Sequence, residues 1–373
     1  MTPVLAHGME GSLVAPDWPA LTIAELRPLL AAYPDAGEPD AITFASPRPF
    51  SAAAVVRCTH GSVFVKRHAR SIRDCEGLGE EHRFLAYLHE HGAPVPRVLA
   101  NADGETAVEA GPWTYEVQEC AAGMDLYRDA FSWTPFNSAD HAHAAGAALA
   151  RLHLAAAGFA APPRKPRPLV ASCSIFAGGD PAAGLEAYLD ARPLLAHHAG
   201  VRRCAAEALK LLEPFYAELQ PLLPHLTPLW THNDLHASNL FWSGAGAQAH
   251  PVTIIDFGLA DQTYAVHGLA HAIERNIVEW LSLPREPAVH FDHLQALLSG
   301  YASVRPLTRA ERAALAPMMA LCHVEVALSE ADYFLRLPGE SRARLAYEGW
   351  LLGHARWFAG AAGGRLCDYL RSH

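Results

Sequence analysis

One short segment, THNDLHASNLFW at residues 231–242, sets an aspartate, two histidines and two asparagines between apolar flanks. The β-branched and aromatic runs at residues 229–232, 240–242 and 252–255 are typical of short strands. Helical periodicity dominates the chain around them. Loops held at both ends by packed elements are common places for function. We therefore expect an α+β protein in which short strands carry functional loops within a mainly helical half.

The length of 373 residues favours two packed units over a single core. Residues 53–58 and 62–66 predict a hairpin, residues 80–91 a helix, and residues 98–99 and 113–118 two further strands. We expect residues 41–119 to form a small mixed sheet with one helix, preceded by an N-terminal extension at 1–40. The segment CAAG at 120–123 is the expected linker to a mainly helical unit, 120–373, with helices at 139–157, 201–219, 290–303, 309–337 and 341–371.

The amino-acid composition limits which classes of partner the protein can bind and in which cellular compartment it is expected. Apolar residues make up 51% of the chain and charged residues 18%, so the chain is not of the disordered class. The net charge is −10 and no block of Lys or Arg occurs, which disfavours nucleic-acid and membrane partners. Seven cysteines without a C-x-x-C pair indicate reduced thiols. With no signal peptide and no apolar run long enough for a membrane, we expect a cytoplasmic protein.

Oxygen-bearing side chains gather in the polar segment and just after it. Asp234 and Asn239 are five residues apart, and Asp256 ends the next strand. Mg²⁺ prefers hard oxygen ligands and commonly takes only one or two from the protein, which Asn239 and Asp256 could supply. Asp234 would then be free to accept a hydroxyl proton in phosphoryl transfer. The competing interpretation, that all three are turn and cap residues, must explain three spacings at once.

The histidines of the segment have simpler explanations. We expect His232 to bond backbone at the base of the loop, and His236 to bond the catalytic carboxylate or contact a phosphate. A zinc site on the two is disfavoured because Asn233 stands where a metalloprotease has its glutamate.

The segments HNDLHASN and IIDFG resemble the catalytic and metal-binding motifs of the aminoglycoside phosphotransferase and choline kinase group. His232, Asp234, His236 and Asn239 match the family's H-x-D-x-H-x-x-N. The resemblance covers residues 50 to 280. It implies a two-lobed, protein-kinase-like fold, ATP with Mg²⁺, and a small-molecule hydroxyl acceptor such as an amino alcohol, amino acid, sugar or aminoglycoside.

The same resemblance implies a nucleotide site in the first lobe. Lys66 matches the strand lysine that binds the α- and β-phosphates, and Glu81 matches the helix glutamate that pairs with it, with Glu80 as a near competitor. Gln118, Glu119 and Cys120 fall at the hinge, where main-chain groups bond the adenine edge.

Three departures from the family pattern stand out. No G-x-G-x-x-G precedes Lys66, and SPRPFSAAA at 46–54 takes its place. Gly268 replaces the aspartate of the family's D-L-A, which puts the bracing of the catalytic loop in doubt. Asn233 stands where many members have glycine, a mild change because Asn tolerates positive φ.

Two questions stay open on the sequence alone. Helical acidic residues beyond the motif could bind an amine, although a solvated helix face is the favoured interpretation; these are Glu274, Glu279, Glu325, Glu330 and Asp332. A protein Ser/Thr kinase and a nucleotide-binding pseudoenzyme are the rival functions. Retention of Asp234, Asn239 and Asp256 argues against the pseudoenzyme.

Overall fold

The computed structural model describes residues 5–8, 10–282 and 286–372. The chain forms two compact units. Unit 1 comprises Met1–Ser132 and Ser238–Ile255, and unit 2 comprises Trp133–Ala237 and Asp256–His373.

Unit 1 is built on a five-stranded sheet in which every neighbouring pair is antiparallel. The order is β3-β4-β5-β7-β6, with β3 at Pro39–Ala45, β4 at Ala52–Cys58, β5 at Gly61–Ala69, β6 at Ala107–Ala110 and β7 at Trp113–Glu119. The predicted hairpin is confirmed, since β4 and β5 pair from Cys58 opposite Gly61. The predicted strand at 98–99 is only a single bridge from Val98 to Gln118.

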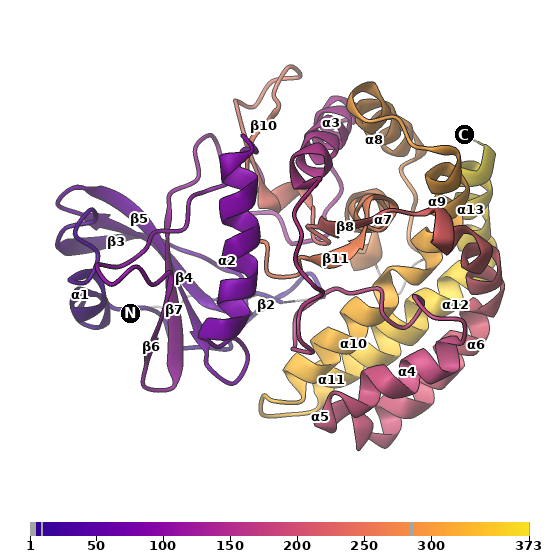
Figure 1. Cartoon of the computed structure of the whole chain (residues 1–373), viewed down its shortest axis with the longest axis horizontal. Helices are drawn as coiled ribbons and strands as arrows, with labels where there is room; N and C mark the ends of the chain where they lie inside the picture. Colours follow the sequence, from indigo (N-terminus) through magenta and orange to yellow (C-terminus); the bar gives the residue numbers. More distant parts are fainter. Residues whose placement is uncertain (1–4, 9, 283–285, 373) are drawn as a thin grey trace. The chain divides into compact units, whose positions relative to one another are not determined.

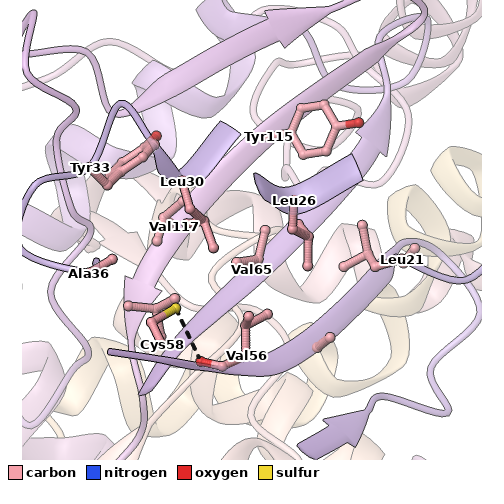
Figure 2. Packing of buried hydrophobic residues seen from close by; sticks show 13 residues of the cluster. Leu21, Leu26, Leu30, Tyr33, Ala36, Val56, Cys58, Val65, Tyr115 and Val117 are labelled. Atoms are coloured by element: carbon pink, nitrogen blue, oxygen red, sulfur yellow. Dashed lines mark hydrogen bonds between the residues drawn. The ribbon is translucent and has the colours of Figure 1, made fainter. Parts of the chain in front are cut away.

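The N-terminal extension covers one face of this sheet. A two-stranded ribbon, β1 (Ala6–His7) with β2 (Leu13–Val14), leads into helix α1 (Ile23–Leu30). The side chain of Thr22 accepts the Glu25 backbone N–H at 3.2 Å and so begins α1. Leu26 and Leu30 are fully buried against Val56, Val65 and Val117 of the sheet (Figure 2). The extension therefore supplies part of the core.

Helix α2 (Cys75–Glu90) lies on the other side of the sheet from α1 (Figure 1). The Asp74 carboxylate caps its start by accepting the Gly77 N–H at 2.8 Å. Side chains alternate between the two faces of a strand. His82 of α2 contacts Glu116 of β7, so Gln118, two residues on, shares the α2 face. Lys66 lies directly opposite Glu116 in the ladder and points to the same face.

Unit 1 also takes in the expected linker and part of the polar segment. Met124 and Trp242 exchange two backbone hydrogen bonds, of 2.7 and 2.8 Å. Trp242 ends β9 (Leu240–Trp242), which pairs with β10 (Pro251–Ile254). These pairings place residues 120–132 in unit 1, whereas the sequence placed the division after residue 119.

Unit 2 is mainly helical, and two short strands, β8 (Pro228–Thr231) and β11 (Asp261–Tyr264), pair within it. Thr308 and Glu311 form a capping box at the start of α9 (Arg309–Leu321). The predicted helix 309–337 divides at Cys322. The α-helices are α3 Ala139–Ala156, α4 Pro181–Asp190, α5 Pro193–Ala196, α6 Ala199–Leu219, α7 Ala265–Ile277, α8 Phe291–Val304, α9 Arg309–Leu321, α10 His323–Phe334, α11 Ser341–Arg344, α12 His354–Ala359 and α13 Ala361–Ser372. Short 3₁₀ turns occupy Gln220–His225, Ala237–Asn239 and Trp280–Ser282, and a π-helix spans Leu345–Gly353.

Helices α3 and α8 cross at backbone contact. A Cβ built on Gly300 would lie 1.9 Å from the carbonyl oxygen of His143, and one on Gly146 would lie 2.1 Å from that of Leu297. Both positions therefore require glycine.

The stretch Arg309–Phe334 is long and apolar enough to cross a membrane by composition, contrary to the expectation that no such run exists. In the structure, 94% of its most apolar window is buried inside the protein. It forms α9 and α10, which serve as core helices of unit 2.

Candidate active site

The base of the polar loop is a buried histidine. The Nδ1 atom of His232 accepts the Asp234 backbone N–H at 3.1 Å, and its ring packs edge-on against Phe257 at 4.5 Å between centroids. The side chain is fully buried. The predicted structural role of His232 is confirmed.

Asn233 fixes the next turn of the loop. Its φ is 61°, as expected for a residue in a position that favours glycine. Its side-chain oxygen accepts from Thr231 Oγ1 at 2.6 Å and lies 3.2 Å from His267 Nδ1, while its Nδ2 donates to the Ala171 carbonyl at 2.9 Å. His267 directly precedes Gly268, the position that departs from D-L-A. The loop is therefore braced through Asn233 and His267.

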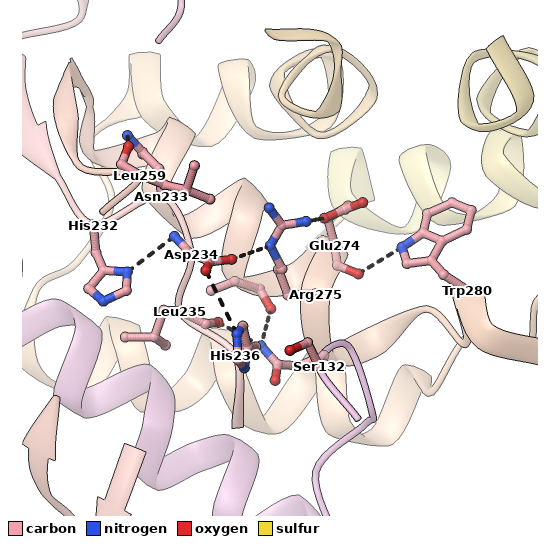
Figure 3. A network of polar contacts seen from close by, with 12 residues as sticks. Ser132, His232, Asn233, Asp234, Leu235, His236, Leu259, Glu274, Arg275 and Trp280 are labelled. Carbon is pink, nitrogen blue, oxygen red and sulfur yellow. Dashed lines mark hydrogen bonds and ion pairs between the residues drawn. The ribbon is translucent and has the colours of Figure 1, made fainter. Parts of the chain in front are cut away.

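Asp234 presents its carboxylate between several charged groups (Figure 3). Its Oδ1 accepts from Arg275 Nε at 2.8 Å, and its Oδ2 lies 3.7 Å from His236 Nε2. Burial raises the pKa of Asp234 to about 7, Arg275 opposes that rise, and the Asp256 carboxylate adds to it. A carboxylate with a pKa near neutrality is matched to the work of a general base.

The predicted metal ligands lie on separate turns. Asp256 follows β10 with a φ of 64°, a strained conformation for a residue other than glycine. The backbone N–H of its neighbour Ile255 donates to the Asn239 carbonyl at 3.0 Å. A carboxylate and an amide oxygen are hard ligands that fit Mg²⁺. Asp234 and Asp256 belong to unit 2 and Asn239 to unit 1, so a common metal site stays a prediction.

Four of the five acidic residues beyond the motif are buried, so the solvated-face interpretation is wrong for these four. Glu274, Glu325, Glu330 and Asp332 are at most 3% exposed. Three of them have strong partners: Glu274 binds Arg275, Glu325 accepts the Ile175 N–H and two serine hydroxyls, and Asp332 binds Arg336. Tertiary packing overrides the surface preference of acidic side chains here.

Glu330 is the exception among these carboxylates. Its Oε2 atom is buried and has no hydrogen-bond partner within the described part of the chain. Burial raises the pKa of Glu330 to about 8; Arg275 opposes the rise, and Asp234 and Glu274 add to it. Glu330 therefore faces the same group of charges as the catalytic loop.

Arg275 was missed in the sequence analysis. The sequence feature that could have indicated Arg275 is the adjacent, oppositely charged pair Glu274 and Arg275. This pair lies within α7, a helix that is otherwise mostly apolar and is buried throughout. Its Nη1 donates to Glu274 Oε2 at 2.9 Å and its side chain is 2% exposed.

The glutamate expected to pair with Lys66 has another partner. Glu81 accepts from Arg73 Nη1 at 2.7 Å, and both side chains are buried. Arg73 lies just before α2. A pair between Lys66 and Glu81 stays a prediction.

The carboxylate of Glu116 lies beside Lys66, directly opposite it on the neighbouring strand β7. Its oxygens lie 2.9 Å from His68 Nε2 and 3.1 Å from His82 Nε2, and Oε2 accepts from Gln118 Nε2 at 2.7 Å. Burial alone would raise the pKa of Glu116, but the two histidines and Lys66 hold it well below its usual value. The side chain of Gln118 is committed to this network.

The expected hinge residues offer fewer groups to an adenine than predicted. The Glu119 backbone N–H donates to the Arg97 carbonyl at 2.9 Å, and its carboxylate accepts from Arg97 Nε at 2.9 Å. That N–H is therefore already used. Cys120 is half-buried, which raises the pKa of its thiol. Main-chain contacts of Cys120 with a nucleotide stay a prediction.

The segment that replaces the glycine-rich loop is tied down inside unit 1. The His7 N–H donates to the Pro47 carbonyl at 2.8 Å. Arg48 lies 3.0 Å from His7 Nδ1 and donates to the Ala130 carbonyl at 3.1 Å and to Ser132 Oγ at 3.2 Å. A backbone hydrogen bond thus holds Pro47, and side-chain bonds hold Arg48.

Comparisons with known proteins show the family and the fold of this chain. Residues 48–307 match the model of the phosphotransferase enzyme family. A homoserine kinase of Gluconacetobacter diazotrophicus is 26% identical over 276 residues, which are 71% of this chain and 72% of that protein. A microcompartment-associated aminopropanol kinase has a TM-score of 0.60 at 17% identity, covering 94% of this chain and 99% of that one. An amicoumacin kinase in complex with AMP-PNP and Ca²⁺ has a TM-score of 0.58 at 16% identity, covering 90% and 91%. These likenesses confirm the predicted fold class.

Proposed function

Because the chain belongs to the phosphotransferase enzyme family, we propose that it moves the γ-phosphoryl group of ATP to a small hydroxyl acceptor that carries a positive charge. The chain is a phosphotransferase with an alcohol group as acceptor, as its motif predicts. ATP as the nucleotide, Mg²⁺ as the metal and a cationic alcohol as the acceptor are parts of the proposal.

Asp234 is the proposed general base. Its buried carboxylate has a pKa near 7, so it can take the proton of the acceptor hydroxyl as that oxygen attacks the γ-phosphorus. Asn239 and Asp256 would hold Mg²⁺, which when bound offsets the charge of the phosphates. Lys66 neutralises charge on the departing diphosphate. Glu116 is the carboxylate directly opposite Lys66 on the neighbouring strand, and the predicted partner Glu81 lies on helix α2.

The positive charge of the acceptor is supported by one observation, the buried carboxylate of Glu330 with an oxygen that lacks a partner in the described structure. A buried carboxyl group without a partner is costly, and a cation beside it would offset that cost. Homoserine and aminopropanol, which name the activities of two similar proteins, each carry a hydroxyl and an amine. An amino alcohol or amino acid therefore fits better than a neutral sugar.

The test is a screen by ADP release with ATP and Mg²⁺. It compares amino alcohols and hydroxy amino acids with neutral diols of the same length, and adds aminoglycosides and sugars. We expect the cationic acceptors to have a kcat/KM at least about tenfold above the matched diols, the effect of one charge-assisted contact. Equal turnover of diols would refute the charge preference.

Two control measurements separate the rival functions. Asp234→Asn should abolish turnover with every acceptor and still show a thermal shift with ATP and Mg²⁺. Radiolabel from ATP on protein and on no small molecule would favour a protein Ser/Thr kinase. A wild-type thermal shift without any turnover would favour the nucleotide-binding pseudoenzyme.

A further inference from the structure

The guanidinium of Arg275 lies next to the catalytic loop, between Asp234 and Glu274 (Figure 3). Its Nε donates to Asp234 Oδ1 at 2.8 Å and its Nη1 donates to Glu274 Oε2 at 2.9 Å. Its carbon centre lies 4.8 Å from the ring centroid of Trp133. The guanidinium donates hydrogen bonds from two of its edges and packs one face against an aromatic ring, and these contacts together fix its orientation.

Glu274 is itself anchored, so it can orient Arg275. The Glu274 backbone carbonyl accepts from Trp280 Nε1 at 3.0 Å, and its Oε1 lies 3.5 Å from His354 Nδ1. The rings of Trp280 and His354 stack at 3.7 Å between centroids. Although burial acts to raise it, the pKa of Glu274 is lowered by Arg275 and His354, so Glu274 is ionised beside the guanidinium.

Arg275 engages one oxygen of Asp234. Oδ1 accepts the charged Nε–H of Arg275 at 2.8 Å, and Oδ2 lies 3.7 Å from His236 Nε2. The second edge of the guanidinium binds Glu274 instead of the other oxygen of Asp234. Arg275 therefore fixes the Asp234 carboxylate relative to helix α7 through a single hydrogen bond.

We propose that Arg275 is a positioning residue that anchors Oδ1 of Asp234 and so holds this carboxylate in the orientation in which it accepts the proton of the acceptor hydroxyl. The inference rests on the proposed function. In the step, the acceptor O–H bond breaks and its proton passes to the Asp234 carboxylate. The oxygen forms a bond to the γ-phosphorus, and the bond from that phosphorus to the bridging oxygen breaks to release ADP.

The test compares Arg275→Ala and Arg275→Lys with the wild type in full kinetics. For Arg275→Ala we expect kcat to fall on the order of 100-fold, the scale for a misplaced catalytic group, while the KM for ATP changes less than threefold. Arg275→Lys keeps a charge but cannot bond Asp234 and Glu274 together in the same geometry, so kcat should fall at least tenfold. Added guanidinium at non-denaturing concentration should restore part of the kcat of Arg275→Ala and none of that of Arg275→Lys.

Arg305→Ala is the matched control. Arg305 also bridges a glutamate, donating to Glu311 Oε1 at 2.6 Å within unit 2, but it touches no residue of the catalytic loop. Its kcat should stay within twofold of the wild type. If Arg275→Ala fails to fold, as judged by circular dichroism, the decision passes to Arg275→Lys.

The inference is overturned if a folded Arg275 variant keeps kcat within twofold, or if Arg305→Ala loses as much activity as Arg275→Ala. These outcomes differ from failure of the proposed function, in which the wild type itself transfers phosphate to no alcohol.

Discussion

Replacing Glu330 by glutamine should stabilise the protein, and by an amount that depends on pH. The folded chain keeps a proton on Glu330 up to a pKa of about 8, whereas the ordinary value is 4.5. A carboxyl group whose pKa is raised in the folded state costs stability as pH rises from its unfolded to its folded pKa. At about 1.36 kcal/mol per pH unit, that cost reaches about 3 kcal/mol at pH 7 and about 5 kcal/mol above pH 8. Glutamine does not titrate and escapes this cost.

The assay is urea unfolding followed by tryptophan fluorescence at pH 5, 7 and 8.5. Glu330→Gln should exceed the wild type by less than about 1 kcal/mol at pH 5 and by about 3 kcal/mol at pH 7. Glu213→Gln, an exposed position in the same unit, should differ from the wild type by at most about 0.5 kcal/mol at every pH. A Glu330→Gln protein that is no more stable at pH 8.5 than the wild type would refute the reasoning.

The same protonation links Glu330 to the acceptor. A cation bound beside it favours the ionised form, so acceptor binding at pH 7 should expel a proton. Calorimetry in phosphate and in Tris, whose ionisation enthalpies differ, measures that proton. Glu330→Gln should bind the cationic acceptor without proton release and more weakly than the wild type. Proton release that persists in this variant would assign the titration to another group.

Gly300→Ala should lose about 1–3 kcal/mol of stability, because the new Cβ would lie 1.9 Å from the His143 carbonyl oxygen. Gly364→Ala is the control and should lose none, because nothing lies within 4 Å of its Cβ position. Thermal unfolding of the two variants and the wild type measures the difference. Arg48→Met removes the bonds to residues 130 and 132 and should raise the KM for ATP several-fold at unchanged kcat, measured by ADP release. Asp256→Asn should lower kcat by on the order of 100-fold, and Mg²⁺ titration of the rate should show the loss at every concentration.

Local patterns in the sequence were enough for the elements that carry the motif. The β-branched and aromatic runs at residues 229–232, 240–242 and 252–255 became β8, β9 and β10. The hairpin before Lys66 was also predictable, since its turn and alternation are local. The role of His232 followed because a histidine beside a tight loop has backbone N–H groups within reach.

The surroundings of the loop depend on residues far apart in the chain. Arg275 lies 41 positions from Asp234, and only tertiary packing brings the two together. Arg73 binds Glu81 across eight positions, a contact that the family pattern does not include. Glu330 was assigned to solvent because acidic side chains on helices usually face water, yet α10 is buried throughout. The edge strand β3 was missed because it opens with proline and alternates weakly.

The anchoring of the Pro47–Arg48 segment by His7 has a practical consequence for preparing this enzyme. An affinity tag fused ahead of Met1 would begin only a few residues from the ribbon that holds this segment. Kinetic constants for ATP are therefore best compared after such a tag has been cleaved.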